Sequence, residues 1–152
     1  FRLIEQVEPE EIIRRLNACL PEGIRVTRIA PPVLKPEAIR WADYQIQLYF
    51  DGQNTGELAR RLTQSYNRPQ LMVAKKTKRG QQQLDIKPLI ARLEAAPNGE
   101  AVQLSVRLAA GIQTNINPML LVGELCDETN SAYDYIQVLR QRILTEDLTD
   151  FE

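Results

Sequence analysis

Four cations stand within five residues, at Lys75, Lys76, Lys78 and Arg79, and Gly80 and three glutamines follow them directly. Ammonium and guanidinium groups neutralise phosphates, and neutral amides can add hydrogen bonds to the same partner. A glycine after such a run is typical of a turn, so the pattern favours a basic hairpin tip that contacts RNA. Two other interpretations are a solvated tip that discourages edge-to-edge strand pairing and a tip that docks on an acidic protein surface.

The charge of the chain is distributed unevenly around this stretch. The net charge is −1, but residues 60–92 contain nine cations and one anion, a net +8, and the rest of the chain therefore carries −9. Such an asymmetry is expected of a protein that presents one basic face to a polyanion, although a solvated loop with ordinary surface arginines would give the same count. If residues 133–144 form a strand, Arg140 and Arg142 point the same way and extend the basic face across a sheet. The candidate nucleic-acid-binding residues are Lys75, Lys76, Lys78, Arg79, Lys87, Arg107, Arg140 and Arg142.

Asp85 is the one acid of the basic segment. On a strand it shares a face with Gln83 and Lys87, where a carboxylate could act as a general base or orient a substrate. The competing interpretation is a counter-charge for Lys87 or Arg107. A polar loop over residues 111–117 supplies further hydrogen-bonding side chains. The candidate polar-site residues are Gln83, Asp85, Thr114, Asn115 and Asn117.

The chain has no histidine, and its two cysteines, Cys19 and Cys126, lie 107 positions apart in apolar helical patterns. Zinc, haem and iron–sulfur clusters need several imidazole or thiolate ligands that converge on one point, so no metal site is predicted. Both cysteines are predicted to be buried free thiols. Histidine-based acid–base catalysis is excluded, no catalytic residue is assigned, and whether the chain is an enzyme is left open.

Three aromatic residues, Trp41, Tyr44 and Tyr49, lie close together in the sequence. Their spacing is not that of two bases stacked on a sheet, and Tyr44 falls on the apolar face of its strand. Core packing is therefore predicted for them in preference to base stacking.

A length of 152 residues with 43% hydrophobic and 26% charged residues is typical of one globular domain. No apolar run reaches the roughly 18 residues that a membrane span needs, so a cytoplasmic protein without a membrane partner is expected. The sequence begins with Phe1 and not with methionine, which suggests a piece of a longer polypeptide.

Hydrophobic periodicity and turn residues predict an alternation of helices and strands. For residues 133–144 a helix was also compatible with the apolar spacing, but the β-branched and aromatic residues favour a strand. The predicted helices begin at Pro9, Pro88 and Pro118 and, with Thr55 as its cap, directly after Thr55; the helix from Pro88 is expected to end at Pro97. The predicted strands cover residues 1–7, 24–29, 44–50, 70–74, 81–86, 102–108 and 133–144.

The predicted order of elements indicates an α+β fold. Residues 1–76 read as strand, helix, strand, strand, helix, strand, which is the ferredoxin-like βαββαβ order with two helices on one face of an antiparallel sheet. Residues 77–145 are expected to form a second antiparallel sheet portion with short helices, packed on the first half into one compact domain. Residues 146–152 form an acidic tail that is expected to be frayed.

Two runs resemble the signatures of a known family. The first runs from Leu16 to Val26 and contains Leu-Asn-Ala and Pro-Glu-Gly; the second is Asp-Ile-Lys-Pro-Leu over residues 85–89, after the Lys/Arg-Gly tip. Together they are similar to the radical-SAM-linked domain of unknown function, over about residues 7–144. One departure is Asn117, which stands where that family has an arginine before the proline.

The resemblance implies a partner and a function. The chain would be the companion of a radical-SAM protein, fused or separate, and the iron–sulfur cluster and S-adenosylmethionine would belong to that partner, with no cofactor in this chain. The family's setting implies a connection to RNA or the ribosome. The expected function is a non-catalytic accessory domain that positions a tRNA, an rRNA or a ribosome-related substrate through the basic hairpin. The alternatives are a protein–protein docking domain for the radical-SAM half and an enzyme that uses Asp85.

Overall fold

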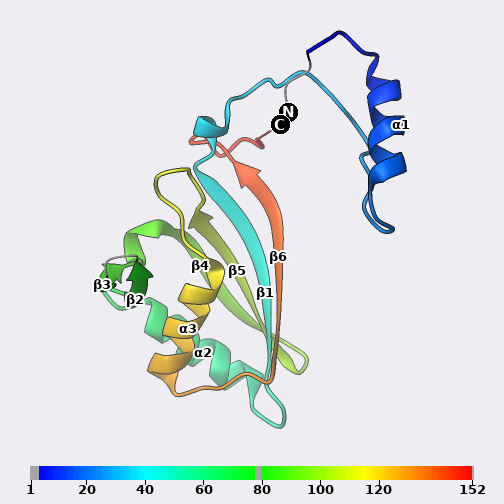
Figure 1. Cartoon of the computed structure of the whole chain (residues 1–152). Helices are drawn as coiled ribbons and strands as arrows, with labels where there is room; N and C mark the ends of the chain where they lie inside the picture. Colours follow the sequence, from blue (N-terminus) through cyan, green and yellow to red (C-terminus); the bar gives the residue numbers. More distant parts are fainter. Residues whose placement is uncertain (1–3, 78–79, 152) are drawn as a thin grey trace. The chain divides into compact units, whose positions relative to one another are not determined.

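The structure is a computed structural model that describes residues 4–77 and 80–151. The chain divides into two compact units, a small N-terminal unit that ends at Val33 and a larger unit from Leu34 to Phe151 (Figure 1). Among the described residues, no helix is long and apolar enough to cross a membrane.

The N-terminal unit contains one helix, α1 (Pro9–Cys19), which begins at a proline and carries Glu10 and Glu11 in its first turn. These features place a residue without an N–H group and two negative charges where the helix dipole favours them, so this predicted helix is confirmed. The Asn17 side chain binds the backbone of Val26 in both directions, at 2.8 and 3.0 Å. The chain after the helix is thereby folded back along it.

Neither strand predicted for this unit is found. Residues 24–30 form no strand, and Ile24 is 58% exposed. Residues 4–7 form no strand, and residues 1–3 lie outside the described residues. The Asn17 side chain binds the Val26 N–H and carbonyl, and the described part of the unit contains no sheet that could bury the alternating apolar side chains. The predicted ferredoxin-like order over residues 1–76 is therefore not observed. Cys19 ends α1 and is exposed, contrary to the prediction, whereas Cys126 is buried as predicted.

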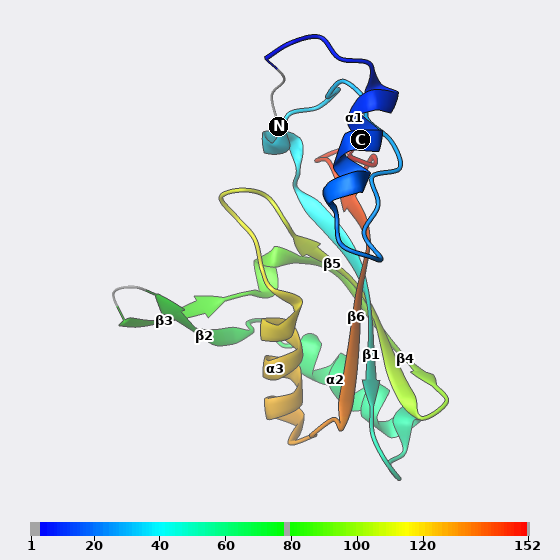
Figure 2. The same cartoon turned by 45° about the vertical axis from the view of Figure 1, so that its right-hand side comes forward.

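The larger unit is built on a four-stranded antiparallel sheet. Its strands are β1 (Trp41–Tyr49), β4 (Ile90–Asn98), β5 (Ala101–Ala109) and β6 (Tyr135–Leu144), in the spatial order β4-β5-β1-β6. Helices α2 (Thr55–Tyr66) and α3 (Pro118–Thr129) cover one face of this sheet (Figure 2). The larger unit is thus an α+β structure with two layers, and its second face carries the polar side chains of the strands.

A two-stranded hairpin forms a separate sheet in the larger unit. Its strands are β2 (Met72–Thr77) and β3 (Gly80–Asp85), and a short 3-10 helix, η2 (Lys87–Leu89), follows them. The buried residues Leu71, Val73 and Ile86 fix the base of the hairpin in the core. From that base the two strands extend away from α3 and the main sheet (Figure 2).

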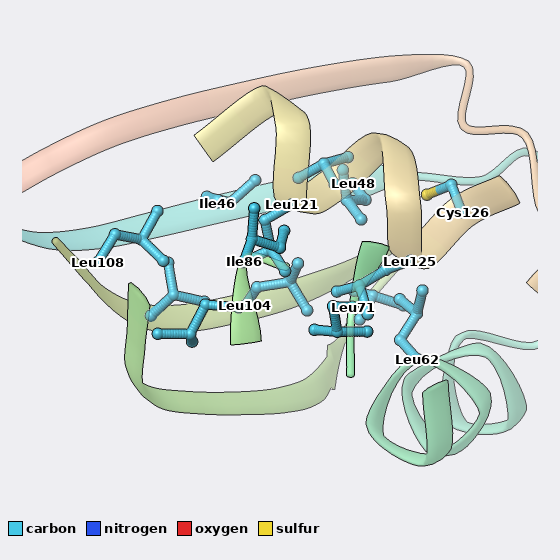
Figure 3. Close-up of a cluster of buried hydrophobic side chains, with 14 of the residues drawn as sticks. Ile46, Leu48, Leu62, Leu71, Ile86, Leu104, Leu108, Leu121, Leu125 and Cys126 are labelled. Atoms are coloured by element: carbon cyan, nitrogen blue, oxygen red, sulfur yellow. The ribbon is translucent and has the colours of Figure 1, made fainter. Parts of the chain in front are cut away.

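The hydrophobic core lies between the sheet and the helices. Side chains of β1, β5, α2 and α3 interdigitate there with residues at the hairpin base (Figure 3). The labelled members are Ile46, Leu48, Leu62, Leu71, Ile86, Leu104, Leu108, Leu121, Leu125 and Cys126. The hairpin base is therefore part of the same packed core as the sheet.

One helix prediction is wrong. The helix expected from Pro88 is limited to η2, and the following residues form β4. A turn at Gly99 and Glu100 joins β4 to β5, with Gly99 in the left-handed region at φ 60°. Asn-Gly at a strand end is a strong hairpin signal, and the short turn sets the antiparallel pairs along the whole of β4. Leu93 and Ala95, spaced by two, then face the core side of the sheet.

The C-terminal prediction is confirmed for the strand and wrong for the tail. Residues 135–144 form β6, the strand that the β-branched and aromatic residues favoured. The acidic tail is not frayed within the described residues, because the Phe151 N–H donates to the Ile143 carbonyl at 2.9 Å and the Thr145 N–H donates to the Thr149 carbonyl at 3.0 Å.

Candidate binding site at the hairpin and its base

The basic hairpin is present in the backbone. Lys75 and Lys76 lie on β2 and pair with Gln82 and Gln81 of β3, and for the two lysines the structure describes the backbone only. Lys78 and Arg79 lie outside the described residues. The prediction that two strands flank the Lys/Arg-Gly run is thereby confirmed, because β2 and β3 pair with each other.

Asp85 organises the base of the hairpin. Its Oδ1 atom accepts the backbone N–H of Leu71 and that of Lys87, each at 3.0 Å. Leu71 is fully buried, so its N–H group needs an acceptor from the protein. Asp85 makes no ion pair with Arg107, which binds another acid. The geometry shows a carboxylate that fixes the entry and exit of the hairpin; Gln83, also on β3, is exposed.

Lys87 is held inside the fold. Its Nζ atom donates to the Tyr66 carbonyl and lies 3.4 Å from the centroid of the Tyr66 ring. Burial lowers the pKa of this ammonium group, and the attraction of Asp85 opposes that shift. The contact joins the hairpin base to the end of α2. The Lys87 ammonium group, which was predicted to bind a phosphate, is therefore already bound within the larger unit.

Arg107 and Arg142 are also paired within the larger unit. Arg107 binds both oxygens of Asp43, at 2.7 and 2.9 Å, and this bond holds the pKa of the Asp43 carboxyl below its usual range. Arg142 pairs with Asp150 at 2.7 Å. Both guanidinium groups therefore bind acids of the same unit, and neither is left unpaired for a basic face.

Arg140 and Arg142 point to opposite faces of the sheet, contrary to the prediction. The register between β1 and β6 shifts by one residue between Asp43 and Tyr44, so that Arg142 lies opposite Asp43 and Arg140 lies opposite Tyr44. The bulge adds Gln141 to β6, and an extra residue reverses the alternation of side chains beyond it. Arg140 is exposed and makes no side-chain hydrogen bond or ion pair with the described part of the chain.

The other cations of the +8 segment meet acids or carbonyls in the fold. Arg60 pairs with Glu57, and Arg92 pairs with Glu94. Arg68 bridges Glu124 and Glu128 of α3, and Arg61 donates to the Thr129 carbonyl. Outside the hairpin, these cations are therefore bound within the larger unit: Arg60 and Arg92 pair inside their own elements, and Arg61 and Arg68 connect α2 and the residues just after it to α3.

A cavity of about 590 Å³ lies next to the hairpin base, at one end of the main sheet. Its walls come from a short 3-10 helix, η1 (Pro36–Ala38), the start of β1, η2, the end of β5 and the loop that leads to α3. The lining residues are Glu37, Arg40, Trp41, Pro88, Leu89, Ala109, Gly111, Ile112, Gln113 and Thr114.

The loop on one side of the cavity is held by backbone contacts. The Ala110 N–H donates to the Arg40 carbonyl at 2.9 Å, and Ala110 forms a bridge with Asn115. A Cβ atom on Gly111 would lie 3.1 Å from the Ile39 carbonyl oxygen, so a side chain at this position would push the loop away. The polar candidates of this loop therefore differ in role: Thr114 lines the cavity and Asn115 closes the loop.

Asn117, the third polar candidate of the loop, caps α3. Its side-chain oxygen accepts the Met119 N–H at 2.9 Å, as expected for an N-cap residue, and the predicted start of the helix at Pro118 is confirmed. The departure from the resembled family at Asn117 thus falls on a helix cap and not on the cavity wall.

The cavity combines an aromatic wall with unlike charges. Trp41 is partly buried, and Arg40 and Glu37 are exposed at the rim. One nitrogen of the Arg40 guanidinium, Nη1, donates to the carbonyls of Glu37 and Ile39 at 2.8 and 3.2 Å. Its other two nitrogens have no partner in the described part of the chain. Sequence reasoning missed Glu37 and Arg40 and assigned Trp41 to the core, because the residues before the strand show no periodicity; the only local signal was a tryptophan next to an arginine.

The described residues contain no group of three or more acids, cysteines or histidines that could hold a metal ion. What the site offers is electrostatic and aromatic contact: cations on the hairpin, and a tryptophan, a guanidinium and a carboxylate around the cavity.

The sequence was compared with known proteins. A family model described as "Uncharacterized protein conserved in bacteria (DUF2344)" matches residues 1–118. The matched range contains the whole hairpin and every residue that lines the cavity. No curated protein and no solved structure matches the chain. The description names no radical-SAM partner, so that part of the resemblance stays a prediction.

Proposed function

The chain thus belongs to the DUF2344 family, and for this member we propose a non-catalytic accessory function in which the β2–β3 hairpin binds RNA. The RNA would be a tRNA, an rRNA or a ribosome-related substrate, presented to a radical-SAM protein that is fused to this chain or separate from it. The iron–sulfur cluster and S-adenosylmethionine would belong to that partner. One observation carries the proposal: four cations stand within five residues of the sequence, directly where the paired strands β2 and β3 extend from a fixed base.

The construction of the hairpin base supports RNA contact over a merely solvated tip. Buried Leu71 and Ile86, the Asp85 carboxylate and the Lys87–Tyr66 contact all fix the direction in which the strands leave the core. A fixed direction lowers the conformational entropy that the hairpin loses on binding. A tip that only discourages strand pairing needs no such support.

The topology of the larger unit also fits an added hairpin, and we propose that this unit is a ferredoxin-like fold. Without the hairpin, its elements follow the order β1, α2, β4, β5, α3, β6, and the sheet order is β4-β5-β1-β6 with antiparallel neighbours. This succession supports a βαββαβ unit that starts at β1. The hairpin is then an insertion between α2 and β4, and such surface additions are common places for binding residues.

RNA binding is tested by filter binding at two salt concentrations. If three or four phosphates are engaged, the affinity for single-stranded RNA should fall with a log–log slope of about −2 to −3. Replacement of Lys75, Lys76, Lys78 and Arg79 by alanine should remove most of the affinity and of the slope. Affinity unchanged in this variant would refute the proposal.

A matched control removes the same charge elsewhere. Arg14, Arg15, Arg25 and Arg28 are exposed arginines of the N-terminal unit. Their replacement by alanine changes the net charge by the same amount as the hairpin variant. The slope should stay near the wild-type value, because a local cation cluster and not the net charge binds the phosphates.

A docking domain for the radical-SAM half is the second candidate, and the edge of the sheet favours it. β6 is an edge strand, and Tyr135, Val138 and Leu139 on it are 57%, 41% and 59% exposed. An exposed apolar edge strand can accept a strand of another protein. Co-purification with the radical-SAM partner in nuclease-treated extract separates the candidates: a complex that persists supports docking, and a complex that is lost supports RNA mediation.

A further inference from the structure

The cavity beside the hairpin base has no role in phosphate binding by the hairpin. We propose that it binds an unstacked base of a single-stranded RNA whose phosphates lie on the hairpin, an inference that rests on the proposed function. Its volume of about 590 Å³ lies in the range of small-ligand pockets, roughly 300–1,000 Å³. It is therefore large enough for a nucleobase with part of its sugar.

The apolar part of the wall suits a flat ring. Trp41 contributes an indole, and Pro88, Leu89 and the loop residue Ile112 contribute apolar surface. Unpaired RNA bases are recognised by stacking on aromatic side chains, and each such stack contributes about 1–3 kcal/mol. A tryptophan at a partly exposed cavity wall is a suitable platform for one base.

The polar part of the wall suits the edge of a base. Two nitrogens of the Arg40 guanidinium are directed to no partner in the described residues, and Glu37 offers a carboxylate on the same side. Arginine donates to ring nitrogens and carbonyl oxygens of bases, and carboxylates accept from exocyclic amino groups. Gln113 adds a neutral amide from the loop. Both donors and acceptors are thus available, as a base edge requires and as a simple anion does not.

The position of the cavity connects it to the hairpin. Only Ile86 lies between β3 and η2, whose Pro88 and Leu89 form part of the wall. A six-residue strand at about 3.3 Å per residue spans about 20 Å, which is the length of roughly six stacked nucleotides. An RNA of about eight nucleotides is therefore long enough to reach from the far end of β3 to the cavity.

Trp41 makes the test specific, because it is the one tryptophan of the chain. The four nucleoside 5′-monophosphates are titrated against tryptophan fluorescence, with inorganic phosphate and ribose 5-phosphate as ligands without a base and a free tryptophan amide as the inner-filter control. We expect saturable quenching by at least one nucleotide and none by phosphate or ribose 5-phosphate. Absence of quenching by all four nucleotides, or equal quenching by ribose 5-phosphate, would overturn the inference.

Variants of the cavity rim check that the base lies where we propose. Arg40→Ala should weaken nucleotide binding by about tenfold or more, since it removes a charged hydrogen-bond donor. Because Arg40 also holds η1 through two carbonyls, the isosteric Glu37→Gln is the second variant, and it should change which base binds best. Arg28→Ala, at an exposed arginine of the N-terminal unit, is the matched control and should leave the quenching unchanged. Quenching that neither rim variant alters would also contradict the inference.

The experiment distinguishes this inference from the proposed function. The quadruple hairpin alanine variant should keep the mononucleotide quenching and lose affinity for an eight-nucleotide RNA. Salt-dependent octamer binding without mononucleotide quenching would refute the base site and leave the hairpin function intact. Mononucleotide quenching without tighter octamer binding would refute the hairpin function and the shared RNA with it.

Discussion

Asp85→Ala tests whether this carboxylate is the organiser of the hairpin base. The substitution removes the acceptor of two backbone N–H groups, those of Leu71 and Lys87. A hydrogen bond to a charged acceptor contributes about 1.5–3 kcal/mol, and a buried donor left without a partner costs about 1–3 kcal/mol. The Leu71 N–H is buried and has no replacement acceptor, whereas solvent can reach the half-buried Lys87. We therefore expect the free energy of unfolding to fall by about 2–3 kcal/mol.

Asp85→Asn separates the hydrogen bonds from the charge. Asparagine keeps an oxygen in the same place, so both N–H groups keep an acceptor and the loss should be only about 1 kcal/mol. Urea unfolding followed by the fluorescence of Trp41 reports on the larger unit, and an unchanged m-value shows that only stability has changed. Gln83→Ala, at an exposed position on the same strand, is the control and should stay within about 0.5 kcal/mol.

Two results would refute this reasoning. An Asp85→Ala protein as stable as the wild type would show that the two hydrogen bonds contribute nothing. An Asn variant as unstable as the Ala variant would show that the negative charge is what matters, which is the counter-charge interpretation of Asp85. The same two variants, assayed for RNA affinity, measure how far the direction of the hairpin matters for binding.

Three further outcomes follow from the larger unit. Because Arg107 lowers the pKa of Asp43, the pair contributes stability that is present above the unfolded pKa of about 4 and is lost as the pH falls through the lower folded pKa. In a pH series of urea unfolding midpoints, Asp43→Asn should therefore show a smaller loss of stability at acid pH than the wild type. Asn54→Ala removes the side chain that accepts the N–H of the third residue of α2, and should lower the free energy of unfolding by about 1 kcal/mol. Burial raises the pKa of the Cys126 thiol to about 11, so a thiol reagent at pH 8 should modify exposed Cys19 at once and Cys126 only on unfolding, as mass spectrometry can show.

The elements that were predicted correctly are those whose apolar and polar residues, or whose first residues, already indicate the structure without reference to a distant partner. β1 and β5 alternate between core and polar faces, and their residues follow that alternation without exception over the central pairs. α1 and α3 begin at prolines with suitable neighbours, so their starts were readable from local chemistry. For α2 the cap was misplaced by one residue: Asn54 caps the helix, and Thr55 is its first residue.

The elements predicted wrongly depend on partners elsewhere in the chain. Residues 24–29 have the composition of a strand, but no neighbouring strand accepts them, and Asn17 binds their backbone instead. β4 has apolar residues that also fit a helix, and its state is decided by eight residues that pair with β5 after the turn at Gly99. Local propensity is a weak prior in both cases, because tertiary pairing overrides it.

The same distinction applies to the site. The hairpin was predictable, since cations, glycine and alternating residues are contiguous there. The cavity was not, because its wall combines the start of β1, η2 and the end of β5, which lie about 50 and 70 residues apart along the chain. Trp41 was expected in the core because its spacing from Tyr44 and Tyr49 is not that of stacked bases, and only the neighbouring elements make it a cavity wall.

The net charge of +8 between residues 60 and 92 shows why a count of cations predicts a partner only in part. Five cations of that segment lie outside the hairpin, and acids or carbonyls of the larger unit meet all five. They are Arg60, Arg61, Arg68, Lys87 and Arg92. The partner acids all lie beyond the two ends of the segment: Glu57 and Glu94 are close neighbours in the sequence, and Glu124 and Glu128 are brought to Arg68 by the tertiary fold. The argument for a polyanionic partner therefore rests on the four hairpin cations alone, which is why the RNA experiment removes those four and leaves the paired ones in place.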